Sequence, residues 1–128
     1  TSGQCLESLE KAKQCGARTI LDVITLHNDD FQAAMQQGAR RFSVPPIQHP
    51  LLTKRIEQEY EKADLLRVMS TPARNTFLAR GFSPSRVFVA APPVDLPDIP
   101  ENRPEPDPFI ISYVGLLEPA KGFHLLID

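Results

Sequence analysis

A segment rich in proline and acidic residues, 92–108, divides this chain of 128 residues into two parts. It contains seven prolines and five acids, and almost no side chains that could form a core. Because proline has no backbone N–H and a fixed φ, such a segment cannot continue a helix or lie inside a sheet. We therefore expect a stiff, polar linker at 96–108, between a first unit at 1–95 and a second unit at 109–128.

The part before the linker alternates helix-like and strand-like segments. Three segments have helical composition or apolar side chains at helical spacing, namely 6–14, 51–63 and 71–80. Three runs rich in apolar and β-branched residues lie between and after them, at 19–24, 65–69 and 86–90. Repeated helix, loop and buried strand is typical of βαβ units. The pattern predicts an α/β fold, a Rossmann-like parallel sheet with flanking helices.

Polar side chains follow the first predicted strand. His27, Asn28 and Asp29 come just past its carboxyl end, and that edge of a parallel sheet is where ligands bind. Asn28 and Asp29 are also typical caps for a helix over 31–37, and we expect capping from these two. His27 remains a candidate for chemistry at this edge.

Two other polar groups have both a structural and a functional interpretation. Ser70 precedes a Thr-Pro pair, so its hydroxyl is expected to cap the helix after the second strand rather than to act in catalysis. Arg40 and Arg41 lie in a predicted loop over 38–50. The two arginines could bind a phosphate, although an exposed, solvated pair is the simpler interpretation.

The second part begins with a continuous apolar run over 109–114, which predicts a strand buried on both faces. Gly115 ends the run, and Lys121 and Gly122 come just before an apolar segment with helical spacing. A strand, a glycine-bounded loop and a helix start can hold an anionic ligand in an α/β sheet. The loop matches neither the Walker pattern nor the dinucleotide fingerprint, so by itself an ordinary strand-to-helix turn is the simpler interpretation.

Composition argues against several classes of protein. The net charge of −2 gives no electrostatic reason to bind nucleic acid. No apolar run approaches the roughly 18–20 residues that span a bilayer. Cys5 and Cys15 would lie about 15 Å apart along a helix over 6–14, which is too far for a disulfide. Two reduced thiols favour a cytoplasmic setting.

The order of the motifs along the chain is more specific than any one of them. They are Glu59-Tyr60 with Ala63-Asp64, Pro93-Val94-Asp95 before the linker, and Gly115 with Lys121-Gly122 after it. Over roughly 16–128 this order resembles that of the retaining glycosyltransferases of family 4. In that family the motifs EY-x-x-AD, GVD and KG follow one another in the same order along the chain. That family has the GT-B fold of two Rossmann-like domains. The resemblance implies that the chain spans the end of the N-terminal domain and the start of the C-terminal, donor-binding domain.

The resemblance also implies site residues. Lys121 would contact the donor's diphosphate, with Gly115 and Gly122 shaping the loop, and His27 would lie near the transferred sugar. A fixed ammonium near a helix N-terminus stabilises the negative charge on the departing diphosphate. On this basis neither a metal ion nor a cofactor is expected.

The implied function is transfer of a sugar from a nucleotide-diphosphate sugar to an acceptor with retention of configuration. The partners would be the donor, a saccharide, lipid or other small acceptor, and the remainder of the parent chain, with no nucleic acid. A lipid acceptor would be compatible with peripheral membrane association of the parent enzyme. As a fragment of that enzyme, the 128 residues alone are expected to be inactive.

Three positions depart from the family's pattern. Leu116 replaces its Arg, Pro93 replaces its Gly, and Met69 replaces its Pro. Because Leu116 stands where the family has Arg, a second hypothesis is a non-catalytic GT-B-like binding or scaffold module with a degenerate donor site. A third hypothesis is a GT-B-like epimerase that acts on sugar nucleotides.

Overall fold

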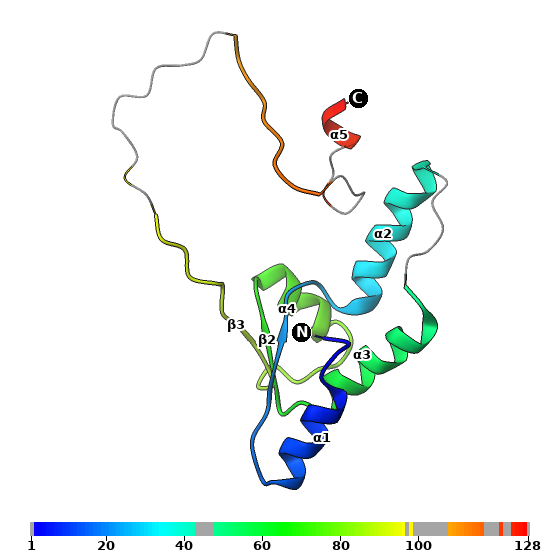
Figure 1. The fold of residues 1–128 in the computed structure, drawn as a ribbon, viewed down its shortest axis with the longest axis vertical. Coiled ribbons are helices and arrows are strands. Elements are labelled where there is room, and N and C mark those ends of the chain that lie inside the picture. The colour runs from blue at the N-terminus through cyan, green and yellow to red at the C-terminus, as the bar shows by residue number, and fades with distance from the viewer. Residues whose placement is uncertain are drawn as a thin grey trace. The chain divides into compact units, whose positions relative to one another are not determined.

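The computed structural model describes residues 2–42, 48–96, 98, 108–116, 121 and 124–127 (Figure 1). Contacts within the chain define two units, Thr1–Pro92 and Pro93–Asp128. The first unit contains a three-stranded parallel sheet in the order β1-β2-β3, with strands Ile20–Val23, Leu65–Val68 and Val87–Val89. Its helices are α1 (Leu6–Gln14), α2 (Asn28–Phe42), α3 (Pro50–Lys62) and α4 (Thr71–Leu78). The predicted α/β class and parallel sheet are confirmed.

One face of the sheet forms the core. Alternate strand residues point to this face and are buried, and they are Leu21, Val23, Leu66, Val68 and Val87. They pack in one cluster with side chains of α1, α3 and α4, among them Leu9, Tyr60 and Phe77. Figure 1 shows α1 and α3 gathered on one side of the strands. The alternation follows from the period of two along a strand, which sends neighbouring side chains to opposite faces.

The helix after β2 begins as the sequence predicts. The Ser70 Oγ accepts the backbone N–H of Ala73 at 3.3 Å, and Pro72 lies in the first turn of α4. Gly81, with φ of 84°, follows the end of the helix. In that conformation a residue with a Cβ would be strained. The capping interpretation of Ser70 is therefore confirmed.

The helix after β1 is longer than the predicted 31–37, and the predicted loop over 38–50 is wrong for its first part. α2 continues through Gly38, Arg40 and Arg41 to Phe42. A glycine inside a helix costs only about 1 kcal/mol relative to alanine, and the neighbouring Gln and Ala residues are good helix formers. The two arginines are consequently residues of a helix.

The predicted buried strand over 109–114 is also wrong. This segment forms no strand, and the side chains of Phe109 and Val114 are 84% and 96% exposed. A strand is stable only when it pairs with neighbours, and the part of 93–127 that the structure describes contains no other strand. The apolar composition of the run therefore gives no sheet here. A short helix, α5 (His124–Ile127), lies further along this unit.

Candidate functional site

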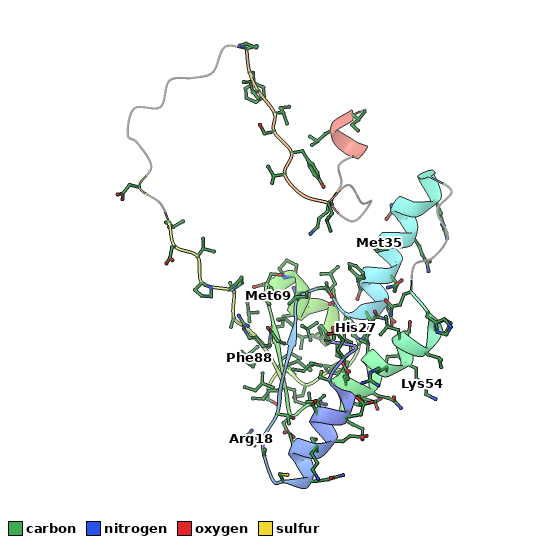
Figure 2. The ribbon with its side chains drawn as sticks, viewed as in Figure 1. Arg18, His27, Met35, Lys54, Met69 and Phe88 are labelled. Carbon is green, nitrogen blue, oxygen red and sulfur yellow. The ribbon has the colours of Figure 1, made fainter. Side chains whose placement is uncertain are left out.

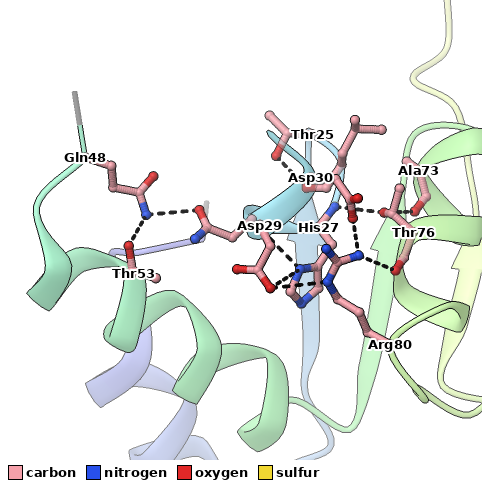
Figure 3. A network of polar contacts seen from close by, with 11 residues as sticks. Thr25, His27, Asp29, Asp30, Gln48, Thr53, Ala73, Thr76 and Arg80 are labelled. Carbon is pink, nitrogen blue, oxygen red and sulfur yellow. Dashed lines mark hydrogen bonds and ion pairs between the residues drawn. The ribbon is translucent and has the colours of Figure 1, made fainter. Parts of the chain in front are cut away.

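The candidate site lies at the carboxyl edge of the sheet, where the segment after β1 meets α4 (Figure 3). The backbone N–H of His27 donates to Thr76 Oγ1 at 2.9 Å. The Thr76 hydroxyl in turn donates to the carbonyl of Ala73 at 2.7 Å. These two bonds join the segment that follows β1 to the helix that follows β2. The edge at which ligands bind in α/β sheets is thereby fixed in place.

The His27 side chain is buried in an aromatic cluster. It is 5% exposed, and its ring centroid lies 5.2 Å from that of Tyr60, 5.0 Å from that of Phe77 and 6.0 Å from that of Phe82. Burial lowers the pKa of His27, because an apolar surrounding disfavours the charged imidazolium. The imidazole is therefore neutral at neutral pH.

Charged neighbours adjust the pKa of His27 in both directions. The Arg80 guanidinium lowers it further, whereas the carboxylates of Asp29 and Asp30 raise it and compensate in part. The Asp29 Oδ2 lies 3.7 Å from the imidazole Nδ1. The overall shift remains downward, since burial is the largest of these effects.

His27 itself caps α2, and the prediction that Asn28 or Asp29 does so is wrong. The imidazole Nδ1 accepts the backbone N–H of Asp29 at 3.3 Å, and the His27 carbonyl accepts the N–H of Phe31 at 3.0 Å. A neutral imidazole that accepts at Nδ1 carries its hydrogen on Nε2. One ring nitrogen is thus occupied by a structural bond.

An exposed charged group borders this buried ring. Arg80 Nε lies 3.2 Å from Asp29 Oδ2, and its terminal nitrogen NH1 pairs with Asp30 and donates to the carbonyl of Thr76 at 3.3 Å. The Asp29 side chain is 50% exposed. The two carboxylates can accept hydrogen bonds from the hydroxyl groups of a polar ligand, and the guanidinium can donate hydrogen bonds to them.

Two side-chain amides, the buried Asn28 and the half-buried Gln48, pair at the start of α2. Gln48 Nε2 donates to Asn28 Oδ1 at 3.0 Å and to Thr53 Oγ1 at 2.9 Å (Figure 3). Asn28 is 4% exposed. Within the described part of the chain, its Nδ2 is the one buried side-chain nitrogen or oxygen that has no hydrogen-bond partner.

The residues implied for the donor side belong to the second unit. Gly115 has φ of 156°, and the hydroxyl of Tyr113 donates to the carbonyl of Leu116 at 2.7 Å. Lys121 is exposed, and Gly122 lies outside the described residues. His27 and Lys121 are therefore in different units, and the structure describes each unit by itself.

Glu59 and Asp64 of the EY-x-x-AD motif hold backbone groups. The buried Glu59 carboxylate accepts the N–H of Gly3 and, at 2.8 Å, that of Cys5, just before α1. Asp64 Oδ2 accepts both the N–H and the hydroxyl of Thr19, at 2.8 and 2.9 Å, at the start of β1.

Tyr60 of the same motif packs against the His27 ring of the candidate site, with the ring centroids 5.2 Å apart. Its pKa is raised to about 12 by burial, and its hydroxyl interacts with the side chain of Ser2 and the backbone of Asn28. The spacing of the motif on α3 gave no sign of these partners, because Ser2 and Asn28 are both distant from Tyr60 in the sequence.

Comparisons with protein-family models, with curated proteins and with solved structures found no match. Among the residues that the structure describes, no three His, Cys, Asp or Glu side chains are grouped so that they could hold a metal ion. None of the helices described is both long enough and apolar enough to cross a bilayer.

Proposed function

We propose that residues 1–128 belong to a retaining glycosyltransferase with the GT-B fold, and that the first unit lies on the acceptor side of its cleft. One observation carries the proposal. The motifs occur in the order of family 4, and the first unit contains a parallel sheet with flanking helices and with polar groups at its carboxyl edge. The parent enzyme would transfer a sugar from a nucleotide-diphosphate sugar to a saccharide, lipid or other small acceptor.

On the acceptor side, His27 fits a positioning role better than direct contact with substrate. Its ring is 5% exposed and its Nδ1 accepts the N–H of Asp29. Fixing the first turn of α2 also fixes the carboxylates of the exposed Asp29 and the half-buried Asp30, which can accept hydrogen bonds from acceptor hydroxyls. Arg80 neutralises part of their charge and leaves the group polar rather than strongly anionic.

On the donor side, the proposal gives the central role to Lys121, with Gly115 and Gly122 shaping its loop. Loss of the nucleoside diphosphate develops negative charge, and an ammonium group stabilises that charge in the transition state. A charge-assisted contact of this kind contributes about 1.5–3 kcal/mol. Leu116 cannot supply a second cation, so Lys121 would act without the family's Arg.

Nucleotide binding tests the proposal. The full-length product of the gene that encodes these residues should bind UDP, GDP or ADP in isothermal titration. The Lys121→Ala variant should bind the same nucleotide about 10-fold to 150-fold more weakly, as 1.5–3 kcal/mol requires. The Leu116→Arg variant should bind it more tightly, because it restores the second cation. No binding of any of the three, together with no effect of Lys121→Ala, would overturn the proposal.

A second candidate, the non-catalytic GT-B-like binding or scaffold module, is favoured by Leu116 and by the buried ring of His27. This alternative predicts a folded chain with no affinity for nucleotides. In that case Leu116→Arg would leave nucleotide binding absent, whereas the enzyme hypothesis expects a gain. The one variant therefore separates the two candidates.

A further inference from the structure

Two histidines cap helices in this chain, and their surroundings differ. At the start of α3 the Nδ1 of His49 accepts the backbone N–H of Leu51 at 3.2 Å, just as the Nδ1 of His27 accepts that of Asp29 at 3.3 Å at the start of α2. His49 is exposed, whereas His27 is buried and labelled in Figure 2 near the middle of the first unit. Two residues further along, His49 has the aliphatic Leu51, and His27 has the carboxylate of Asp29. The same kind of cap therefore has an acidic neighbour at His27.

Four ionisable groups among the described residues face the His27 ring. Asp29 Oδ2 lies 3.7 Å from the imidazole Nδ1, and the same oxygen lies 3.2 Å from Arg80 Nε. Arg80 also pairs with Asp30 through its NH1. The fourth group is the Tyr60 hydroxyl on α3, and its pKa of about 12 keeps it neutral at and below neutral pH. The ring thus has two carboxylates from α2 and one guanidinium from the end of α4 as its charged neighbours.

A proton added to His27 must change the first turn of α2. It can enter the ring only at Nδ1, because the neutral imidazole that accepts there carries its hydrogen on Nε2. Nδ1 then becomes a donor that faces the N–H of Asp29, so the capping bond is lost. The Asp29 carboxylate, 3.7 Å away, is about 1 Å beyond the distance of a charge-assisted hydrogen bond. The released N–H lies in the first turn of a helix at an exposed residue, where water can accept from it.

We propose that His27 is a pH-sensitive switch for the first turn of α2. On protonation the imidazole gives up the Asp29 N–H and forms an ion pair with the Asp29 carboxylate, while Arg80 loses that carboxylate and keeps Asp30. Figure 3 shows the two contacts of Asp29 that are exchanged. Repulsion between two cations at one oxygen, Asp29 Oδ2, favours the exchange. The ring stays in place, because the His27 N–H is bonded to Thr76 Oγ1 at 2.9 Å and aromatic side chains surround the imidazole.

The exchange changes the charge of the carboxyl edge. Protonation adds one positive charge and leaves Arg80 with one carboxylate in place of two. Because burial lowers the pKa of His27, the exchange takes place below about pH 6.5. The switch does not rest on the proposed function, since it involves neither a sugar donor nor an acceptor.

The test follows the 128-residue chain by NMR from about pH 7.5 to about pH 4.5. The ring nitrogens of His27, the backbone N–H of Asp29 and the Nε–H of Arg80 should shift with one common midpoint while the spectrum remains that of a folded protein. The Arg80 Nε–H should exchange with water at least twofold faster below this midpoint than above it, because it has lost Asp29 Oδ2. His49→Gln removes the other histidine cap, serves as the matched control and should leave these three signals unchanged.

Two variants test the exchange itself. Asp29→Asn keeps the backbone N–H but removes the carboxylate, so it should lower the midpoint of His27 by about one pH unit or more and abolish the response of Arg80. Arg80→Gln removes the competing cation and should raise the midpoint.

Three results would overturn the inference. One is an unchanged midpoint of His27 in Asp29→Asn, and another is an Arg80 signal that does not follow the His27 ring in the wild type. The third is titration of the ring only as the protein unfolds, because the folded protein would then have no second state. None of these outcomes depends on whether the protein binds nucleotides.

Discussion

At the scale of single residues, Glu59 shows how a buried carboxyl group can hold a distant chain segment in place. Its side chain has no exposed surface, and its carboxylate meets the N–H groups of Gly3 and Cys5. Arg55 lies one turn earlier on α3, donates to the Gly3 carbonyl at 3.0 Å and pairs with Glu7. The N-terminal segment is therefore held to α3 through polar contacts, which an isolated helix pattern does not reveal.

Replacing Glu59 should be costly. Glu59→Ala leaves two backbone donors without their acceptor, and each such loss costs about 1–3 kcal/mol. We expect the free energy of unfolding to fall by about 2–4 kcal/mol, measured by urea titration with circular dichroism. Glu57→Ala, an exposed position on the same helix, should change it by less than about 0.5 kcal/mol. Equal effects at the two positions would contradict the role of Glu59.

His27 gives a pH-dependent prediction. Burial holds its pKa in the folded protein below the ordinary 6.5 of the unfolded chain. Above about pH 7 the imidazole is neutral in both states. As the pH falls through 6.5, the unfolded chain binds a proton that the folded protein does not, so the free energy of unfolding decreases until the pH passes the folded pKa.

The measurement is the urea midpoint at pH 7, 6 and 5 for the wild type and for His27→Asn. The wild type should lose stability across this range, by at most about 1.4 kcal/mol per pH unit. His27→Asn retains a side chain that can cap α2 and should show a shallower slope. Asp64 and Glu7 have pKa values of about 2, so their contributions are lost only at lower pH. Identical slopes in the two proteins would exclude His27 as the source.

At the scale of elements, the contacts between chain segments decide which predicted helices and strands form. Arg86, just before β3, donates to the carbonyls of Tyr60 and Ala63 at 2.9 and 2.7 Å, at the end of α3. Its guanidinium also lies 5.8 Å from the centre of the Phe82 ring. One side chain thus satisfies the last carbonyls of a helix and fixes the start of a strand.

The Arg86→Ala variant should therefore unfold more easily. The loss of several charge-assisted hydrogen bonds to backbone carbonyls is expected to lower the free energy of unfolding by about 1–3 kcal/mol. Arg18→Ala, at an exposed position, serves as the control and should be neutral. Urea titration followed by circular dichroism measures both. A loss below about 0.5 kcal/mol for Arg86→Ala would show that water replaces these bonds at no cost.

Much of the first unit could be predicted because its signals are local. The run at 65–69 is short and mostly apolar, and the hydroxyl of Ser70 caps α4 through the N–H of Ala73, three residues further along. The capping role of His27 could not be predicted in the same way, because imidazole is an uncommon cap and its burial depends on distant aromatic rings. The prediction of a strand at 109–114 was wrong for a related reason. A strand forms only when a neighbouring strand pairs with it, and the composition of the run does not reveal whether such a neighbour exists.

At the scale of the whole molecule, the first unit contains all three strands of the sheet and the whole core cluster. The division between the units falls at Pro92 and Pro93, at the start of the proline-rich segment. The donor-side role of Gly115 and Lys121 rests on the glycine-bounded loop in the sequence and on the resemblance, and it stays a prediction.

A chain that ends at Pro92 should consequently fold by itself. Its urea midpoint is expected to match that of the 128-residue chain, because no core residue of the first unit lies beyond Val87. Circular dichroism should show one cooperative transition. A lower midpoint for the shorter chain would mean that residues 93–128 contribute to the stability of the sheet.

Sugar transfer is the measurement that tests the central claim most directly. The full-length gene product is incubated with nucleotide-diphosphate sugars, and release of nucleoside diphosphate and the anomeric configuration of the product are followed by NMR. The proposal predicts release with retained configuration, and a loss of about 10-fold to 150-fold in kcat/KM for Lys121→Ala. Inverted configuration, or release that Lys121→Ala leaves unchanged, would contradict it.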